Sequence, residues 1–82
     1  MILVIYRNMK LMILVSNNLK QIRINKGFTQ KEMARRVGIT LTNYGYIELG
    51  KSEPRLKTAL LISKVLEESI HRLFSLEEKK YE

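Results

Sequence analysis

The stretch FTQKEMARRVGITLTNYGYIELG, residues 28–50, has the pattern of two short helices joined by a tight turn. Thr29 and Glu32 have the spacing of a capping box, in which each side chain pairs with the other residue's otherwise unpaired backbone N–H at the start of a helix. Gly38 follows, where a left-handed residue closes the last helical turn. The pattern therefore predicts a helix between Thr29 and Gly38, with a change of direction after it.

The second helix of this stretch is predicted between Thr40, which can cap it, and Gly50, which ends it. Ala34 is small enough to let the two helices cross closely. The apolar residues expected to fill the corner between the helices are Met33, Val37, Ile39, Tyr44 and Ile47. A tight helix–turn–helix of this kind leaves the outer face of the second helix protruding and uncommitted.

Three further helices are predicted around this pair. Residues 16–27 form one, which Asn17 or Asn18 can cap and a glycine ends. Residues 55–66 form a second, with an apolar stripe wide enough to be central to the core. The residues expected along its inner face are Leu56, Ala59, Leu60, Ser63 and Leu66. Residues 69–74 form a short last helix.

The first fifteen residues, MILVIYRNMKLMILV, hold two apolar runs. Their Ile and Val content predicts strands at 2–6 and 11–15. An isolated hairpin is marginal in water, so these strands need to pack on the helices or on another chain. Neither run reaches the roughly 20 apolar residues of a membrane span, so no membrane partner is expected. The residues of the candidate dimer surface are Ile2, Val4, Leu11, Ile13 and Val15.

The predicted fold is mainly α, with five helices and an N-terminal β-strand or hairpin. The predicted divisions are an apolar extension over 1–16, a helical domain over 17–76 and a charged tail over 77–82. The tail is expected to fray. In a different interpretation the first residues are an upstream extension, with Met9 or Met12 as the natural start.

The 82 residues carry a net charge of +7, and the basic excess lies in the middle of the chain. Residues 19–57 hold nine basic and three acidic side chains, which is the electrostatic footprint of a protein that meets a polyanion. There is no cysteine and a single histidine, His71, so no metal site is expected. No nucleophile triad, paired carboxylates or glycine-rich phosphate loop stands out, so we expect neither an enzyme nor a cofactor.

Three segments, LKQIRINKGFTQKEMARRVGIT, YIELGKSEP and SIHRLF, together resemble the phage Cro and lambda-type repressor (XRE) family of helix-turn-helix DNA-binding domains. The resemblance extends over residues 18–74. It implies that Gln30 anchors a DNA phosphate and that the helix after Thr40 enters the major groove. It also implies a structural ion pair between Arg23 and Glu48. The residues that it implies at the DNA are Gln30, Thr40, Leu41, Thr42, Asn43, Tyr46, Lys51 and Arg55.

The sequence departs from the family pattern at several positions. Leu41 and Gly45 stand where relatives usually have polar or basic residues, so leucine is expected to pack on a thymine methyl group. Tyr44 replaces a buried aliphatic residue, and its hydroxyl then needs a partner or an exit to solvent. Glu67 and Glu68 replace a glycine and an aliphatic residue before the last helix, so a differently built turn is expected there.

These observations predict a sequence-specific double-stranded DNA-binding transcriptional regulator in the cytoplasm. We expect a repressor that binds a palindromic operator as a homodimer, because one such module contacts too few bases for genomic specificity. Two alternatives stay open. One is an antitoxin that binds its operator and a toxin. The other is a helix-turn-helix scaffold that holds a protein partner through Leu41, Tyr46 and Leu49.

Overall fold

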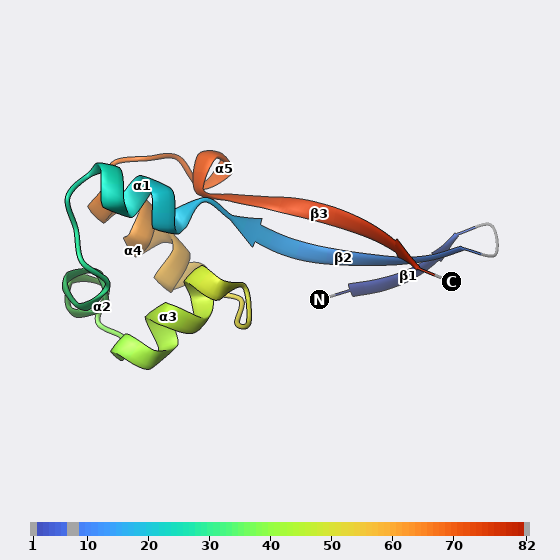
Figure 1. The fold of residues 1–82 in the computed structure, drawn as a ribbon, viewed down its shortest axis with the longest axis horizontal. Helices are drawn as coiled ribbons and strands as arrows, with labels where there is room; N and C mark the ends of the chain where they lie inside the picture. The colour runs from blue at the N-terminus through green and yellow to red at the C-terminus, as the bar shows by residue number, and fades with distance from the viewer. Residues whose placement is uncertain (1, 7–8, 82) are drawn as a thin grey trace.

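The helices gather into one body, from which a long β-sheet projects (Figure 1). The computed structural model describes residues 2–6 and 9–81, with side chains over 12–80. In chain order the elements are β1 (Ile2–Tyr6), β2 (Met9–Asn17), α1 (Leu19–Asn25), α2 (Gln30–Val37), α3 (Leu41–Leu49), α4 (Leu56–Leu66), α5 (Ile70–Leu73) and β3 (Phe74–Tyr81). We call the helical part, residues 19–73, the head and the three strands the β-arm. The mainly α fold with an N-terminal hairpin is confirmed, and none of the helices described could cross a membrane.

The ends of α2 and α3 follow the predicted capping signals. The Thr29 side chain accepts a hydrogen bond from the backbone N–H of Glu32 at 3.0 Å, and the Glu32 carboxylate accepts one from the backbone N–H of Thr29 at 3.1 Å. These hydrogen bonds hold the pKa of Glu32 below its usual value. Thr40 caps α3 by accepting from the backbone N–H of Asn43 at 3.0 Å. Gly38, with φ of 80°, closes α2 in the left-handed conformation.

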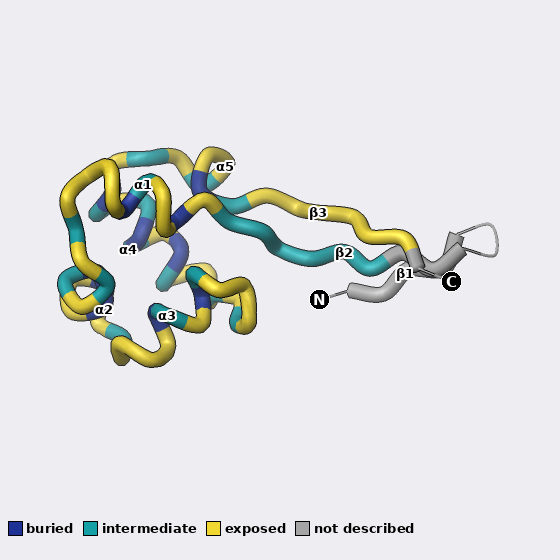
Figure 2. The backbone as a smooth tube through the Cα atoms, viewed as in Figure 1, coloured by how far each residue is buried: buried dark blue, intermediate teal, exposed yellow. Residues whose placement is uncertain are grey.

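The core lies between the inner faces of the helices (Figure 2). Its most buried members are Leu19, Met33, Ala34, Val37, Tyr44, Ile47, Ala59, Ile62, Leu66 and Leu73. The prediction for α4 is wrong at Leu56 and Leu60, which are 74% and 52% exposed. The buried stripe of α4 runs instead through Ala59, Ile62 and Leu66, at spacing i, i+3 and i+7, which turns positions 56 and 60 away from the core.

The β-arm is an antiparallel sheet in the order β1-β2-β3. β1 pairs with the outer half of β2, where Ile2 lies opposite Ile13. The second strand, expected over 11–15, extends over Met9–Asn17. Its inner half therefore pairs with β3 alone among the described strands.

The prediction of a frayed tail is wrong. Residues Phe74–Tyr81 form β3, which pairs with β2 from Asn17↔Phe74 out to Lys10↔Tyr81. The side chains of 75–80 are exposed and mostly charged. The segment therefore lacks the alternation of apolar and polar residues from which a strand could be predicted. It is held by backbone hydrogen bonds to the open edge of β2, and these do not depend on side-chain polarity.

The β-arm joins the head with almost no linker. Asn18 is the single residue between β2 and α1, and β3 follows α5 directly. The backbone N–H of Asn18 donates to the carbonyl of Leu73 at 2.9 Å, which binds the two connections to each other. A second bridge joins the hydroxyl groups of Ser16 and Ser75 at 2.8 Å. The molecule measures 45 × 22 × 20 Å along its principal axes.

The turn between α4 and α5 keeps a left-handed residue at its start. The sequence led us to expect a different turn, whereas Glu67 adopts φ of 54° and ψ of 43°, the conformation that a glycine favours. Two carbonyls of the last turn of α4 accept from the backbone N–H of Glu67. The chain therefore keeps the turn at the expense of a strained residue.

Replacing Glu67 with glycine should raise the free energy of unfolding by about 1 kcal/mol. A non-glycine residue in the left-handed region costs roughly 1–2 kcal/mol, and the greater freedom of glycine in the unfolded chain offsets part of this gain. Urea unfolding at neutral pH measures the difference. Glu67→Ala is the control, because it removes the carboxylate and keeps the Cβ atom. Equal stability of the glycine and alanine variants would contradict this account.

Candidate nucleic-acid interface

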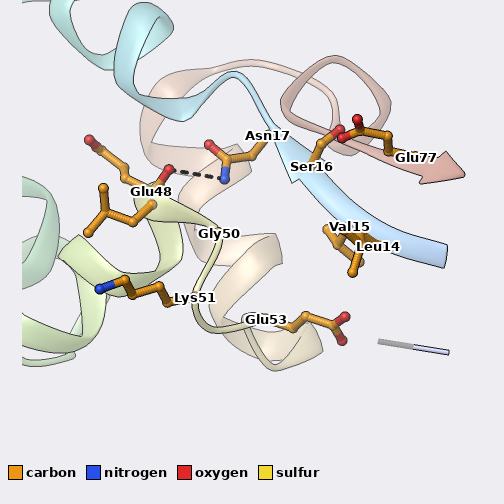
Figure 3. Close-up of a pocket in the computed structure, with 10 residues that line it drawn as sticks. Leu14, Val15, Ser16, Asn17, Glu48, Gly50, Lys51, Glu53 and Glu77 are labelled. Atoms are coloured by element: carbon orange, nitrogen blue, oxygen red, sulfur yellow. Dashed lines mark hydrogen bonds between the residues drawn. The ribbon is translucent and has the colours of Figure 1, made fainter. Parts of the chain in front are cut away.

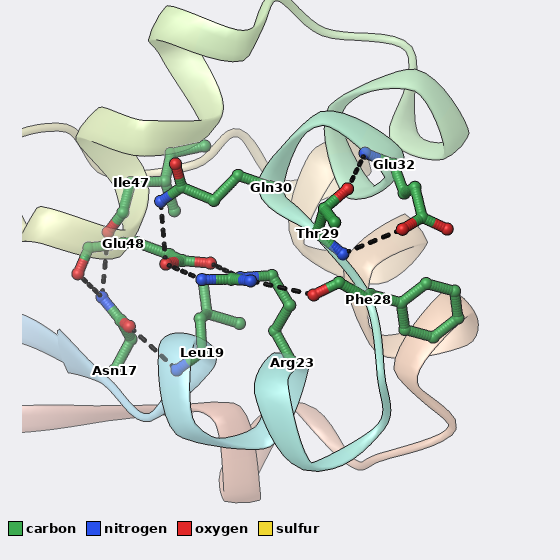
Figure 4. A network of polar contacts seen from close by, with 9 residues as sticks. All are labelled: Asn17, Leu19, Arg23, Phe28, Thr29, Gln30, Glu32, Ile47 and Glu48. Atoms are coloured by element: carbon green, nitrogen blue, oxygen red, sulfur yellow. Dashed lines mark hydrogen bonds and ion pairs between the residues drawn. The ribbon is translucent and has the colours of Figure 1, made fainter.

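A buried ion pair fixes α3 against α1. The Nε atom of Arg23 lies 2.6 Å from Oε2 of Glu48, and the two side chains are only 9% and 3% exposed (Figure 4). A second guanidinium nitrogen, Nη2, donates to Oε1 of Glu48 at 3.3 Å. The third, Nη1, donates to the carbonyl of Phe28 at 2.9 Å. The guanidinium therefore ties α1 to α3 and to the loop that leads into α2.

The ionisation of this pair follows from its hydrogen bonds. The hydrogen bond to Glu48 raises the pKa of Arg23 above its usual value. Burial opposes ionisation of Glu48, but the hydrogen bonds that it accepts from Arg23 and Gln30 outweigh burial and leave its pKa lowered. Burial also raises the pKa of Tyr44, whose hydroxyl lies close to both charges. That hydroxyl makes no hydrogen bond of standard geometry with the residues described.

Gln30 connects this network to the start of α2. Its side-chain Nε2 donates to Oε1 of Glu48 at 3.1 Å, so the first residue of α2 is held against α3 (Figure 4). An amide nitrogen carries two hydrogens, and no second partner for this group occurs among the described residues. The expected phosphate anchor thus has one N–H engaged inside the protein and one left for an external acceptor.

The outer face of α3 carries the residues expected to contact base edges. Leu41 and Tyr46 are 50% and 48% exposed, and Thr42 and Asn43 are exposed as well. Tyr44, on the opposite face, is fully buried. The helix thus uses one side to attach to the head and presents the other to solvent. Thr40, the remaining expected residue of this group, caps the helix.

The expected backbone clamps flank this face. The left-handed Gly50 reverses the chain, and the N–H of Lys51 then donates to the carbonyl of Tyr46 at 2.9 Å. This places Nζ of Lys51 5.8 Å from the centroid of the Tyr46 ring, within range of a cation–π contact. Arg55, just before α4, lines a hollow together with Asn43 and Lys57. The structure thus brings the expected clamps next to the expected readers.

Lys57 and Asn17 also belong to this region, although neither was predicted as a site residue. Lys57 was counted only as part of the basic segment, yet it lines the same hollow as Asn43 and Arg55. Asn17 was considered only as a cap for α1. Its Oδ1 does accept from the N–H of Leu19 at 3.0 Å, but its Nδ2 also donates to the carbonyl of Ile47 in α3 at 2.9 Å. Nothing in the local sequence signals that second contact.

The β-arm reaches the end of α3 through this asparagine. Nδ2 of Asn17 also lies 3.4 Å from the carbonyl of Glu48, and a groove opens beside it between β2 and the loop after α3 (Figure 3). The side chains of Val15, Lys51 and Glu77 are among those that line the groove. The C-terminal end of the expected reading helix is therefore also the place where the β-arm meets the head.

Acid should weaken the fold through Glu48. Its pKa is lower in the folded protein than the value of about 4.3 expected in the unfolded chain. The stabilisation is therefore complete above that unfolded value and is lost as the pH falls through the lower folded pKa. Glu48→Gln should lower the free energy of unfolding at neutral pH by about 3 kcal/mol, because Arg23 is left buried without its counter-charge.

Urea unfolding measured across the acidic range tests this prediction. Glu48→Gln should show a weaker loss of stability towards low pH than the parent chain. Glu78→Gln, at an exposed carboxylate on β3, is the matched control and should keep the parental pH dependence. An unchanged acid dependence in Glu48→Gln would show that the ion pair is not its source.

Comparison with known proteins also identifies the head as a helix-turn-helix domain. The helix-turn-helix family model matches residues 19–73, which is the head without the β-arm. The chain is 48% identical over 48 residues to the SPbeta prophage-derived uncharacterized HTH-type transcriptional regulator YonR of Bacillus subtilis, covering 58% of this chain and 44% of YonR. It is 45% identical over 58 residues to the regulator YqaE of the same species, covering 71% of this chain and 50% of YqaE. The chain thus spans about half the length of these two relatives.

Solved structures with the same arrangement of helices include two DNA-binding or transcription proteins. The N-terminal DNA-binding domain of SinR from Bacillus subtilis aligns with a TM-score of 0.59 and 30% identity, covering 65% of this chain and 78% of that one. The hypothetical transcription factor NHTF from Neisseria aligns with a TM-score of 0.62 and 25% identity, covering 67% of this chain and 62% of that one. By its sequence match and its fold, this chain belongs to the Cro and lambda-type repressor (XRE) family of helix-turn-helix DNA-binding transcriptional regulators.

Proposed function

We propose that this protein is a repressor that reads a palindromic operator as a homodimer and acts in the cytoplasm. The observation that carries the proposal is the division of α3 into two faces. One face is fixed by Tyr44 and the buried ion pair, whereas the other is exposed and flanked by Lys51 and Arg55. A helix held rigidly on one side can present a constant set of groups to a DNA groove.

The exposed side chains of α3 suit the edges of base pairs. The amide of Asn43 can pair with adenine through two hydrogen bonds, and Thr42 can donate, accept or contact a thymine methyl group. Leu41 offers apolar contact to thymine, and Tyr46 can reach a base edge or a phosphate. We therefore assign sequence reading to these four residues.

Phosphate contacts are assigned to the groups around them. Lys51 and Arg55 bring positive charge to the two ends of the loop after α3, and Gln30 stands at the N-terminus of α2 with one N–H left to donate. The N-terminal end of a helix attracts an anion through its dipole and unpaired N–H groups. These contacts fix the position of the reading helix and do not depend on base sequence.

The homodimer is proposed because one head reads few bases. A single module of this size covers about 600–1,000 Å² of DNA interface, whereas two copies across a palindrome double the contacts. We assign the dimer surface to the β-arm. Its register places Ile2 opposite Ile13 and Val4 opposite Leu11. The expected dimer residues of the two strands are therefore paired with each other, at every second position along each strand.

Repression is the simpler outcome for a protein of this design. A dimer on an operator can block transcription by occupying the site, whereas activation requires an additional contact with the transcription machinery. Occupancy requires only the reading face, the clamps and the dimer surface already described.

Selection of bound duplexes from a randomised DNA pool tests this function. We expect an enriched palindrome whose half-sites lie about one helical turn apart, and a dimeric mass by sedimentation. The same selection with Asn43→Ala should lose preference at a single base pair of each half-site, worth about 1–3 kcal/mol. Asn25→Ala, which removes an exposed asparagine from the end of α1, is the control. An unchanged base preference when Asn43, Thr42 and Tyr46 all become alanine would exclude α3 as the reader.

Lys51→Gln and Arg55→Gln should weaken binding to every sequence. Each phosphate contact releases condensed counterions, so the loss of one should reduce the slope of log affinity against log salt by about 1. Affinity for the selected operator and for an unrelated duplex, followed over a range of salt concentrations, gives that slope. Lys64→Gln, an exposed lysine of α4 outside the interface, should leave it unchanged. A steeper loss on the operator than on the unrelated duplex would contradict the assignment to the backbone.

A further inference from the structure

The β-arm and the reading helix are fastened to each other, and we infer that Asn17 is the positioning residue that sets the spacing between operator half-sites. The inference rests on the proposed function, because it needs a dimer formed through the β-arm. Residues 2–17 and 74–81 lie outside the matched segment 19–73, so the family model does not describe this connection.

Asn17 makes hydrogen bonds in two directions from the end of β2. Its Oδ1 accepts from the N–H of Leu19, the first residue of α1, at 3.0 Å. Its Nδ2 donates to the carbonyls of Ile47 and Glu48, at 2.9 and 3.4 Å, across to the last turn of α3 (Figure 4). The backbone N–H of Gly50 already donates to the carbonyl of Ile47 at 3.1 Å, so Asn17 adds a second hydrogen bond to this carbonyl and also reaches the carbonyl of Glu48 from the β-arm.

Neither connection between arm and head leaves room for a flexible linker. One residue separates β2 from α1, and α5 runs directly into β3. The neighbouring Asn18 bonds to the other connection, through its backbone to Leu73 at 2.9 Å and through its side chain to Arg72 at 3.2 Å. Asn18 thus joins the two strands to the base of the head, whereas Asn17 joins the arm to α3 itself.

A small rotation at Asn17 produces a large displacement at the far end of the β-arm. A strand of nine residues, such as β2, is about 30 Å long at roughly 3.3 Å per residue. A rotation of about 10° at Asn17 therefore moves the far end of the β-arm by about 5 Å, which exceeds the rise of about 3.4 Å per base pair. In a dimer joined through the arms, small changes at Asn17 become changes of one or more base pairs in half-site separation.

Operators with the same half-sites at a series of spacings test the inference. The parent chain should prefer one spacing by at least about tenfold in affinity, and Asn17→Ala should reduce that preference to about threefold or less while keeping its base preference and dimeric mass. Asn17→Asp keeps the oxygen that Leu19 requires and replaces the amide donor, so it separates the contact with α3 from the cap of α1. Asn25→Ala, at an exposed asparagine at the end of α1, is the matched control and should keep the parental spacing. The parental preference in both Asn17 variants would overturn the inference.

A distance measurement within one chain separates this inference from the proposed function. The protein has no cysteine of its own, so spin labels can be attached after Leu41→Cys at the start of α3 and Lys79→Cys on β3. With labelled chains diluted in unlabelled ones, the parent background should give a narrow distance distribution and Asn17→Asp a broader or shifted one. Equal distributions would overturn the positioning role even if the DNA results were as expected. If the parent chain selects no paired half-sites, the dimeric function fails, and the inference fails with it whatever the distances show.

Discussion

A charge buried in a small protein is costly unless it is paired, and the head is organised around one such pair. Arg23 and Glu48 lie almost fully out of solvent and bind each other through two nitrogens and two oxygens. Through Phe28 and Gln30 the same network also reaches the loop before α2 and its first residue. The orientation of α3 relative to the other helices therefore depends on one electrostatic contact as well as on apolar packing. Breaking it from either side would leave an isolated charge in the interior.

Local signals predicted the head well because its boundaries are set by residues close together in sequence. Thr29 with Glu32, and Thr40, cap their helices as their spacing indicates, since a cap involves side chains within three residues of each other. The inner residues of α2 were also predicted, because its apolar stripe is narrow. In α3 apolar residues lie on several sides, and Tyr44 and Ile47 were predicted as inner residues from their place in the helix-turn-helix pattern. The wide stripe of α4 gave several possible inner faces, and the choice among them depends on what the helix packs against. That choice is made by the tertiary fold, and Leu56 and Leu60 were assigned to the wrong side.

The features missed in the β-arm and at its junction depend on residues far apart in the chain. β3 has exposed, mostly charged side chains, and it becomes a strand because the edge of β2 offers backbone partners. Asn17 is separated by 30 positions from Ile47, whose carbonyl it binds, so the local sequence indicates only its role at the start of α1. The residues proposed for DNA contact came from a resemblance to a family, and the structure adds which of them stand together. The sequence therefore supplied the candidate interface, while the three-dimensional fold was needed to connect it to the β-arm.

The direct junction between head and arm has a consequence for the order in which the molecule assembles. Pairing Lys10 with Tyr81 in an unfolded chain would close a loop of about 70 residues, at an entropic cost of about 4 kcal/mol. Once the head has folded, the contact between Asn18 and Leu73 already holds the two chain segments side by side. The pairing of β2 with β3 can then extend outward from Asn17 and Phe74, and each further residue pair closes only a short loop of chain. The head thus acts as a template for the pairing of β3 with β2, whose register follows from the folded helices.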